Sequence, residues 1–222
     1  MKPMVYSHSA LKQFLSCARQ FAEVRIWKNV KVAPTSATDF GVRAHAAFED
    51  YICAGKPLPQ DMQPYQAFVD TVNTAPGVKH CEVKYGLTAS MQACDFFGGP
   101  VRIRGVADVV IRADTTAYVL DYKSGKDSRP DMSQLELMAL MEFAANPACQ
   151  RITGALIFFV AGSMTRATWT RDDIPGMWAK WVALMDRADR AVESEVFQES
   201  PSGLCRGWCP VTECHHWQEK RK

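Results

Sequence analysis

The sequence has no long apolar run and almost no excess of charge of either sign. Its 222 residues include 26 Lys and Arg against 24 Asp and Glu, which leaves a formal net charge of +2. This near balance of positive and negative charge does not by itself indicate a nucleic-acid partner, and a polyanion would have to bind in a local groove. No apolar segment approaches the roughly 20 residues that cross a bilayer. The apolar stretch 155–162 is typical of a buried strand.

Three further signals are missing. No segment near the start combines basic residues, an apolar run and a small-residue cleavage site, which predicts a cytoplasmic protein without a signal peptide. No G-x-x-x-x-G-K-[ST] motif is present, which excludes a P-loop motor, so unwinding of DNA would need a helicase or recombination partner. There is no internal repeat or low-complexity linker. With 47% hydrophobic residues, the chain is expected to form one domain over residues 1–222.

The spacing of apolar residues predicts helices and strands that alternate along the chain. Ser7 or Ser9 can cap a first helix whose apolar face continues to Ala22. Helical spacing also covers residues 38–53, 65–72, 131–145 and 175–195. A period of two, typical of strands, covers residues 80–87, 101–112, 116–122, 151–161 and 165–170. This order predicts an α/β fold with a mixed central sheet flanked by helices.

Two neighbouring strands carry charged residues, and the length of the turn between the strands determines which of these residues face each other. If residues 114–115 form a two-residue loop, Asp108 lies directly opposite Asp121. Such opposed side chains have Cβ atoms roughly 4.5–5.5 Å apart. Lys123 follows Asp121 by two residues and therefore projects from the same face. A three-residue loop would shift the pairing by one and separate the two acids.

Two facing carboxylates in a mostly apolar sheet repel each other unless a cation compensates. Oxygen ligands suit Mg²⁺ or Mn²⁺, and Mg²⁺ in particular is often held by a few carboxylates, waters and a substrate phosphate. Lys123 beside such a site can orient or deprotonate an attacking water, or stabilise charge on a phosphate. The alternative is a surface salt bridge between Asp108 and Lys123 across an ordinary hairpin.

Five short segments follow one another between residues 41 and 138: Gly41-x-x-x-His45, a strand with Glu82, Gly105-x-x-Asp108, Asp121-x-Lys123-x-Gly125, and Gln134 on a helix. In this order they resemble the motifs of the RecB-like branch of the PD-(D/E)XK nuclease superfamily. Two positions depart from the family pattern. Met138 stands where the family has Tyr, and Asp121 stands where it often has Glu.

The resemblance implies a restriction-endonuclease-like core and a set of metal ligands. The ligands would be the His45 imidazole, the Asp108 and Asp121 carboxylates and the Tyr122 carbonyl. Residues 41, 45 and 49 recur at intervals of four, so they share one helix face. The alternative for His45 is an ordinary histidine packed on its helix.

The resemblance also implies catalytic roles for three further residues. Lys123 would act on the water or the phosphate, and Gln134 would hydrogen-bond the water or the DNA backbone. Glu82 would support the ligands or bind a second metal ion. The alternatives are an ordinary polar residue near a helix start for Gln134 and a solvated strand acid for Glu82.

The eight cysteines divide into a scattered and a clustered set. Without a secretion signal, free thiols or metal ligands are expected rather than disulfides. The scattered set is typical of small buried hydrophobic residues and comprises Cys53, Cys81, Cys94 and Cys149. The clustered set has the spacing C-x₃-C-x₄-C and comprises Cys205, Cys209 and Cys214, with Cys17 as a candidate fourth member.

This layout resembles the Fe–S-containing RecB-like nucleases, among them the AddB nuclease domain and the CRISPR-adaptation exonucleases. The resemblance implies a [4Fe–4S] cluster on Cys17, Cys205, Cys209 and Cys214 that joins residues 1–30 to residues 196–222. The commoner family spacing is C-x₂-C-x₅-C. The alternative is a zinc site made by four cysteines, or by three with His215 or His216.

Together these features predict a Mg- or Mn-dependent deoxyribonuclease, an exonuclease acting on DNA ends or single strands, in DNA repair, recombination or a related process. The alternatives are a structure-specific endonuclease and a non-catalytic DNA-binding assembly factor on a nuclease fold. A DNA groove can be lined by Arg19, Arg25, Lys28, Lys126 and Arg129, with Tyr6, Trp27 or Trp208 as stacking surfaces. The alternative for each is a solvated charge or a core aromatic.

Overall fold

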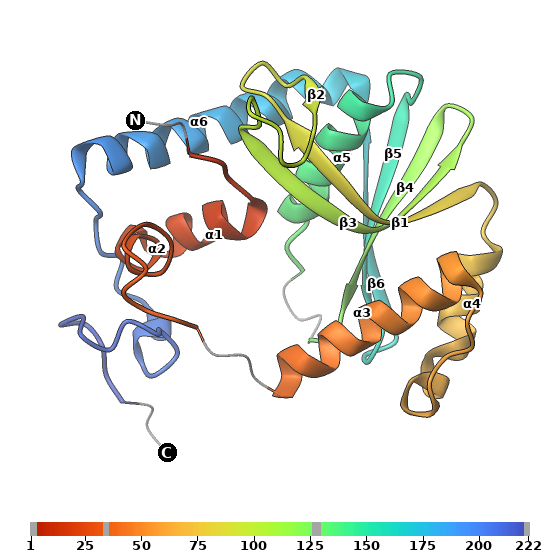
Figure 1. Cartoon of the computed structure of the whole chain (residues 1–222), viewed down its shortest axis with the longest axis horizontal. Coiled ribbons are helices and arrows are strands. Elements are labelled where there is room, and N and C mark those ends of the chain that lie inside the picture. The colour runs from red at the N-terminus through yellow and green to blue at the C-terminus, as the bar shows by residue number, and fades with distance from the viewer. Residues whose placement is uncertain (1–3, 33–35, 126–129, 220–222) are drawn as a thin grey trace. The chain divides into compact units, whose positions relative to one another are not determined.

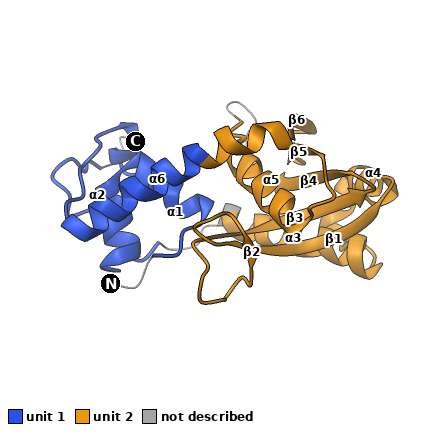
Figure 2. Ribbon diagram, turned by 90° about the horizontal axis from the view of Figure 1, so that it is seen from above, with its two compact units in different colours: residues 1–34, 179–222 blue, residues 35–178 orange. Residues whose placement is uncertain are grey.

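The computed structural model describes residues 4–32, 36–125 and 130–219 (Figure 1). The chain forms two compact units (Figure 2). The larger one consists of residues 35–178. The smaller one combines residues 1–34 with residues 179–222, so segments from the two ends of the chain belong to the same unit.

The larger unit is built on one six-stranded sheet with the order β2-β1-β3-β4-β5-β6. Its strands are β1 (Val78–Leu87), β2 (Ala93–Cys94), β3 (Ile103–Ala113), β4 (Thr116–Lys123), β5 (Arg151–Phe158) and β6 (Ser163–Thr170). Strands β4 and β5 are parallel and all other neighbours are antiparallel. The predicted mixed sheet is therefore confirmed, with the short β2 as an addition that the sequence pattern did not indicate.

Helices α3 (Ser36–Ala54) and α4 (Gln66–Thr74), with the 3-10 turn η2 (Gln60–Tyr65) before α4, pack on one face of this sheet. Their contact is aromatic: the Phe48 ring meets the rings of Tyr122 and Phe159 edge to face at 5.2 Å each. Such edge-to-face pairs bury large apolar area in a fixed geometry.

Helix α5 (Ser133–Ala145) crosses the sheet closely because glycines lie beneath it. A Cβ atom at Gly154 would lie 3.0 Å from Leu135 Cβ, and one at Gly105 would lie 2.3 Å from Met138 Cε. Met138 itself is only 3% exposed. The methionine in place of the family's tyrosine is therefore a core residue packed on Gly105.

A buried ion pair ties α5 to two strands. Glu142 is fully buried and accepts hydrogen bonds from the Tyr85 hydroxyl at 2.6 Å and from Arg112 Nε and Nη2 at 2.7 Å each. Burial raises the pKa of Glu142, but the bonds from Arg112 and Tyr85 outweigh it, so the pKa is lowered. A buried carboxylate with this many donors stays charged and locks the helix in register.

The smaller unit begins with a helix that is shorter than the apolar pattern predicted. Helix α1 (His8–Ser16) has Ser7 as its N-cap, as expected, with Ser7 Oγ accepting from the Ala10 N–H. It breaks at Cys17, whose backbone is extended at φ −166° and ψ 113°. The chain then resumes as α2 (Ala18–Phe21) and a π-helical turn, η1 (Ala22–Ile26). The remaining elements are η3 (Arg171–Asp173), α6 (Ile174–Ser194), which runs from one unit into the other, and η4 (Gly203–Cys205).

One expectation drawn from the sequence is wrong. Cys53 at the end of α3 and Cys81 in β1 form a disulfide rather than two isolated buried thiols. Tyr6 is fully buried, with its hydroxyl donating to Asp189 at 2.9 Å, so of its two predicted roles the core aromatic is confirmed and base stacking is excluded. Within the described residues, no helix combines the length and apolarity that spanning a membrane requires.

Candidate active site

The turn between β3 and β4 has the two residues that the sequence predicted. Ala113 pairs with Thr116 across it, which confirms the register. The regular ladder ends one step before Asp108 and Asp121 would pair. Beyond that point the Tyr122 N–H donates to Asp108 Oδ2 at 2.8 Å, so the carboxylate is held against the β4 backbone.

Strand β3 is also irregular at its other edge. Its ladder with β1 is regular on both sides of Glu82 and Asp108 but skips these two residues. Glu82 has a φ of +49°, a left-handed conformation that side-chain-bearing residues seldom adopt. A residue held in this conformation interrupts the alternation of a strand, and such strain is found disproportionately at functional sites. Asp108 therefore sits where both neighbouring ladders are interrupted.

His45, in the middle of α3, reaches the same point. Its Nε2 lies 2.9 Å from the Tyr122 carbonyl oxygen, and its Nδ1 lies 3.4 Å from Asp108 Oδ2. When both ring nitrogens carry a proton, Nε2 donates to the Tyr122 carbonyl and Nδ1 donates toward Asp108. Burial lowers the pKa of His45, but the hydrogen bond and charge of Asp108 outweigh it and raise the pKa.

Asp121, Lys123 and Gln134 form a closed triangle of polar contacts. Lys123 Nζ lies 2.5 Å from Asp121 Oδ2 and donates to Gln134 Oε1 at 3.1 Å. Gln134 Nε2 donates to Asp121 Oδ1 at 2.6 Å. The side-chain amide of Gln134, at the start of α5, therefore orients both Asp121 and Lys123 of β4.

Asp121 is the most perturbed acid of the group. It is 4% exposed, and burial, followed by the negative charge of Asp108, raises its pKa to about 6 although Lys123 acts in the opposite direction. Among the described residues, no group makes a hydrogen bond of good geometry to its Oδ2, which has only the ion pair with Lys123. A second acid beside an under-coordinated buried carboxylate fits a divalent cation, which satisfies both.

Glu82 belongs electrostatically to the same neighbourhood. Burial raises its pKa first, and the negative charges of Asp108 and Glu49 raise it further. Glu49 lies one helical turn beyond His45 on α3, and its charge near Glu82 was not anticipated as a site feature. Its i+4 spacing from His45 was the signal for it in the sequence.

The glycine of the G-x-x-x-H segment allows α3 to approach the end of β4. A Cβ atom at Gly41 would lie 3.3 Å from Ser124 Oγ, tighter than most real contacts. This close approach brings the helix face with His45 to the strand with Tyr122.

The structure thus brings six of the predicted residues of the larger unit together: His45, Glu82, Asp108, Asp121, Lys123 and Gln134, with the Tyr122 carbonyl. Their chemistry is that of a cation site with an amine beside it. Their catalytic roles remain predictions.

The clustered cysteines gather in the smaller unit. Cys17, Cys205, Cys209 and Cys214 are free thiols that line one pocket. Burial raises the pKa of Cys209, and the charges of Cys205, Cys17 and Cys214 contribute to this shift. Cys17 lies at the break after the first helix and is one of the residues that line this pocket. Four soft sulfur donors around one pocket fit an iron–sulfur cluster or zinc.

The predicted DNA-contact residues are only partly free for such a role. Arg19 pairs with Glu23 at 2.7 Å and lies 5.0 Å over the Trp27 ring, and Arg25 donates to Gln13 at 2.8 Å. Trp208 is 66% exposed. Lys126 and Arg129 lie outside the described residues.

Comparison with known proteins shows a family and two solved structures to which this chain is similar. A family model described as the PD-(D/E)XK nuclease superfamily matches residues 63–214. A solved structure of a candidate exonuclease from Eubacterium rectale has a TM-score of 0.53 at 13% identity, covering 92% of this chain and 86% of that one. The crystal structure of SSO0001 has a TM-score of 0.49 at 10% identity, covering 97% and 87%. At 13% identity the Eubacterium rectale structure shows the fold alone. No protein of curated function matches the sequence.

Proposed function

The chain belongs to the PD-(D/E)XK nuclease superfamily, and on that premise we propose that it is a metal-dependent deoxyribonuclease that degrades DNA from ends or as single strands. One observation carries the proposal: Asp108 and Asp121, interacting as neighbouring charges, lie beside the Lys123 amine and the His45 imidazole. The similar fold of the candidate exonuclease from Eubacterium rectale supports a nuclease, and the preference for ends is part of our proposal.

The chain's own residues would share the work as follows. Asp108, Asp121 and His45, with the Tyr122 carbonyl, would hold Mg²⁺ or Mn²⁺, and Glu82 would support them or hold a second ion. The ion when bound polarises a phosphate and makes a nearby water more acidic. Lys123 places its positive charge where charge builds on the phosphate, or takes the proton of the attacking water. Gln134 keeps Lys123 and Asp121 aligned and can donate to the DNA backbone.

The test is cleavage of labelled DNA with Mg²⁺ or Mn²⁺. The substrates are linear duplex, linear single strand, closed circles, and linear strands with either end blocked. We expect linear single strands or duplex ends to be degraded and circles to survive. Cleavage of circles would instead indicate the structure-specific endonuclease. Activity that persists in Asp121→Ala would mean a contaminant or another site.

A non-catalytic assembly factor is the alternative from another class. Such a factor would bind DNA without cleaving it, whichever divalent ion is added. The intact set of Asp108, Asp121 and Lys123 favours catalysis, because a binding protein has no need of an amine paired with a buried acid.

We further propose a [4Fe–4S] cluster on Cys17, Cys205, Cys209 and Cys214, with a structural role in the smaller unit. The support is the shared pocket of four free thiols drawn from both ends of the chain. Because no P-loop motif is present, a helicase or recombination partner would supply single strands in DNA repair or recombination. Iron content and brown absorbance after anaerobic purification test the cluster; zinc without iron would replace it by the zinc site.

A further inference from the structure

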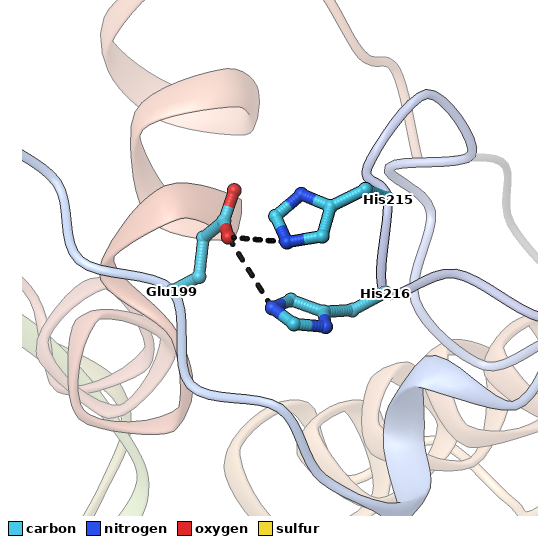
Figure 3. A group of neighbouring side chains, drawn as sticks. All are labelled: Glu199, His215 and His216. Carbon is cyan, nitrogen blue, oxygen red and sulfur yellow. Dashed lines mark ion pairs between the residues drawn. The ribbon is translucent and has the colours of Figure 1, made fainter.

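Three polar side chains of the smaller unit converge next to the cysteine pocket without belonging to the thiol set. Figure 3 shows His215 and His216 turned toward the carboxylate of Glu199. Their Nε2 atoms each lie 3.4 Å from the same oxygen, Glu199 Oε2. One ligand atom from each of the three residues can be chosen so that all lie within 4.8 Å of one another.

The spacing fits a shared ion better than it fits hydrogen bonds. A good N–H···O bond spans about 2.7–3.2 Å, so both contacts are long for direct bonds. Two ligand atoms bound at about 2.1 Å to a tetrahedral zinc ion lie about 3.4 Å apart. Each histidine–glutamate contact therefore has the length expected between two ligand atoms of one tetrahedral zinc ion. The two imidazole rings also lie close together, with centroids 3.9 Å apart and an angle of 42° between their planes.

The backbone around these residues holds the convergence in place. His215 and His216 are consecutive residues of a turn, and Figure 3 shows both side chains on the side of Glu199. That turn is anchored by Trp217, whose indole N–H donates to the Cys209 carbonyl at 3.1 Å and whose backbone N–H donates to the Cys214 carbonyl at 2.8 Å. On the facing segment, the Gln198 carbonyl accepts from the Arg19 N–H at 3.3 Å. These bonds fix the backbone on both sides of the group, with the two histidines facing Glu199.

We propose that Glu199, His215 and His216 form a second metal site for a borderline divalent ion, Zn²⁺ in the first instance, separate from the four cysteines. Two imidazoles and one carboxylate are a ligand set that zinc accepts, whereas Mg²⁺ and Ca²⁺ prefer oxygen ligands alone. The His215 side chain is 70% exposed, so a fourth position faces solvent and takes water. The ion joins the segment at residue 199 to the tail at residues 215–216 and closes one wall of the cysteine pocket, which Glu199 and His216 also line.

The experiment counts bound zinc in the full-length holoprotein after equilibration with Zn²⁺ and dialysis. The variants are Glu199→Gln, which keeps the size of the side chain, and His215→Ala, which removes a mostly exposed ring. The matched control is Glu219→Gln, an exposed carboxylate in the same tail. The parent and the control should retain one equivalent more than either variant, and the two variants should bind zinc at least tenfold more weakly at this site.

A cobalt substitution identifies the ligands of the lost equivalent. The difference spectrum between parent and Glu199→Gln loaded with Co²⁺ should contain ligand-field bands without a thiolate-to-cobalt band. Equal zinc retention in all four proteins would overturn the proposal. A thiolate-to-cobalt band in the difference spectrum would overturn it as well, because the histidines would then complete a cysteine site. Neither readout depends on nuclease activity, so failure of the proposed nuclease function would leave this result unchanged.

Discussion

At the scale of single residues, Asp121 shows how a charged group of the candidate site lowers the folding stability of the chain. Its carboxylate is buried beside Asp108, and its pKa is raised to about 6 from an ordinary value of 3.8. The folded chain therefore binds this proton more tightly than the unfolded chain does. The stabilisation from the proton is complete below about pH 3.8 and is lost as the pH rises through 6.

The first prediction follows from that sign. In EDTA at pH 8, Asp121→Asn should have a free energy of unfolding about 1–3 kcal/mol above that of the parent, because each unit of pKa shift corresponds to about 1.4 kcal/mol. The difference should shrink as the pH falls below 6 and vanish below about 4. Urea denaturation across this range measures it. A variant less stable than the parent at pH 8 would show that the ion pair with Lys123 outweighs the burial of the charge.

The second prediction separates chemistry from folding at Lys123. Lys123→Ala should lower the cleavage rate at least a hundredfold, the range expected when a positioned proton-transfer or charge-stabilising group is removed. Its far-UV circular dichroism should be unchanged, because the Lys123 side chain is already 37% exposed. Lys56→Ala, which removes an exposed lysine paired with Asp50, is the control and should cleave at the parent rate. Equal rates in the two variants would remove Lys123 from the catalytic group.

At the scale of elements, helix α5 connects the site to the sheet. Gln134 at its start orients Asp121 and Lys123, Met138 in its middle fills the space over Gly105, and Glu142 near its end binds two strands. A small displacement of this helix would therefore reach the active site directly. The aromatic contacts of α3 position His45 in a comparable way from the other face.

The third prediction tests this anchoring. Glu142→Ala should destabilise the protein by about 3 kcal/mol, because it leaves Arg112 and the Tyr85 hydroxyl without their acceptor. This loss of stability lies at the low end of the range for breaking a buried ion pair. The reason is that 32% of the Arg112 side chain is exposed and can be hydrated again. Urea denaturation measures the change, with Glu193→Ala, an exposed helical glutamate, as the control. A loss below about 1 kcal/mol would mean that packing alone holds α5.

At the scale of the whole molecule, the two units are stabilised in different ways. The larger unit has a sheet with an apolar core on one face and α5 on the other. The smaller unit brings its two end segments together around the thiol pocket, and its last residues contain little regular structure. Metal ligands commonly stabilise such segments, because a small unit buries too little apolar surface alone.

The fourth prediction follows from this difference. Cys17→Ser should remove the cluster absorbance and leave amides of residues 196–219 open to hydrogen exchange, while amides of β3, β4 and β5 stay protected. Cys94→Ser, which changes a half-buried cysteine of the larger unit, should leave both readouts at the parent level. Hydrogen exchange with mass spectrometry resolves the two regions. Unchanged protection of the tail in Cys17→Ser would show that the cluster has no structural role.

The sequence alone determined those features that are encoded over short distances. The two-residue turn at 114–115 set the hairpin register, and the sequence limited the N-cap of the first helix to Ser7 or Ser9, of which Ser7 caps it. Local spacing indicated which side chains share a strand or helix face, and the family resemblance carried by the motifs around Asp108, Asp121 and Lys123 indicated the nuclease fold and the candidate site.

Only the tertiary structure decided which distant residues meet and how deeply they are buried. The pairing of Cys53 with Cys81, the burial of Tyr6 and the convergence of Glu199 on two histidines join segments that no period in the sequence relates. The raised pKa of Asp121 likewise depends on helix α5 covering the sheet. Burial and long-range contact arise from packing of the whole chain, and a local pattern contains no information about them until the elements have docked.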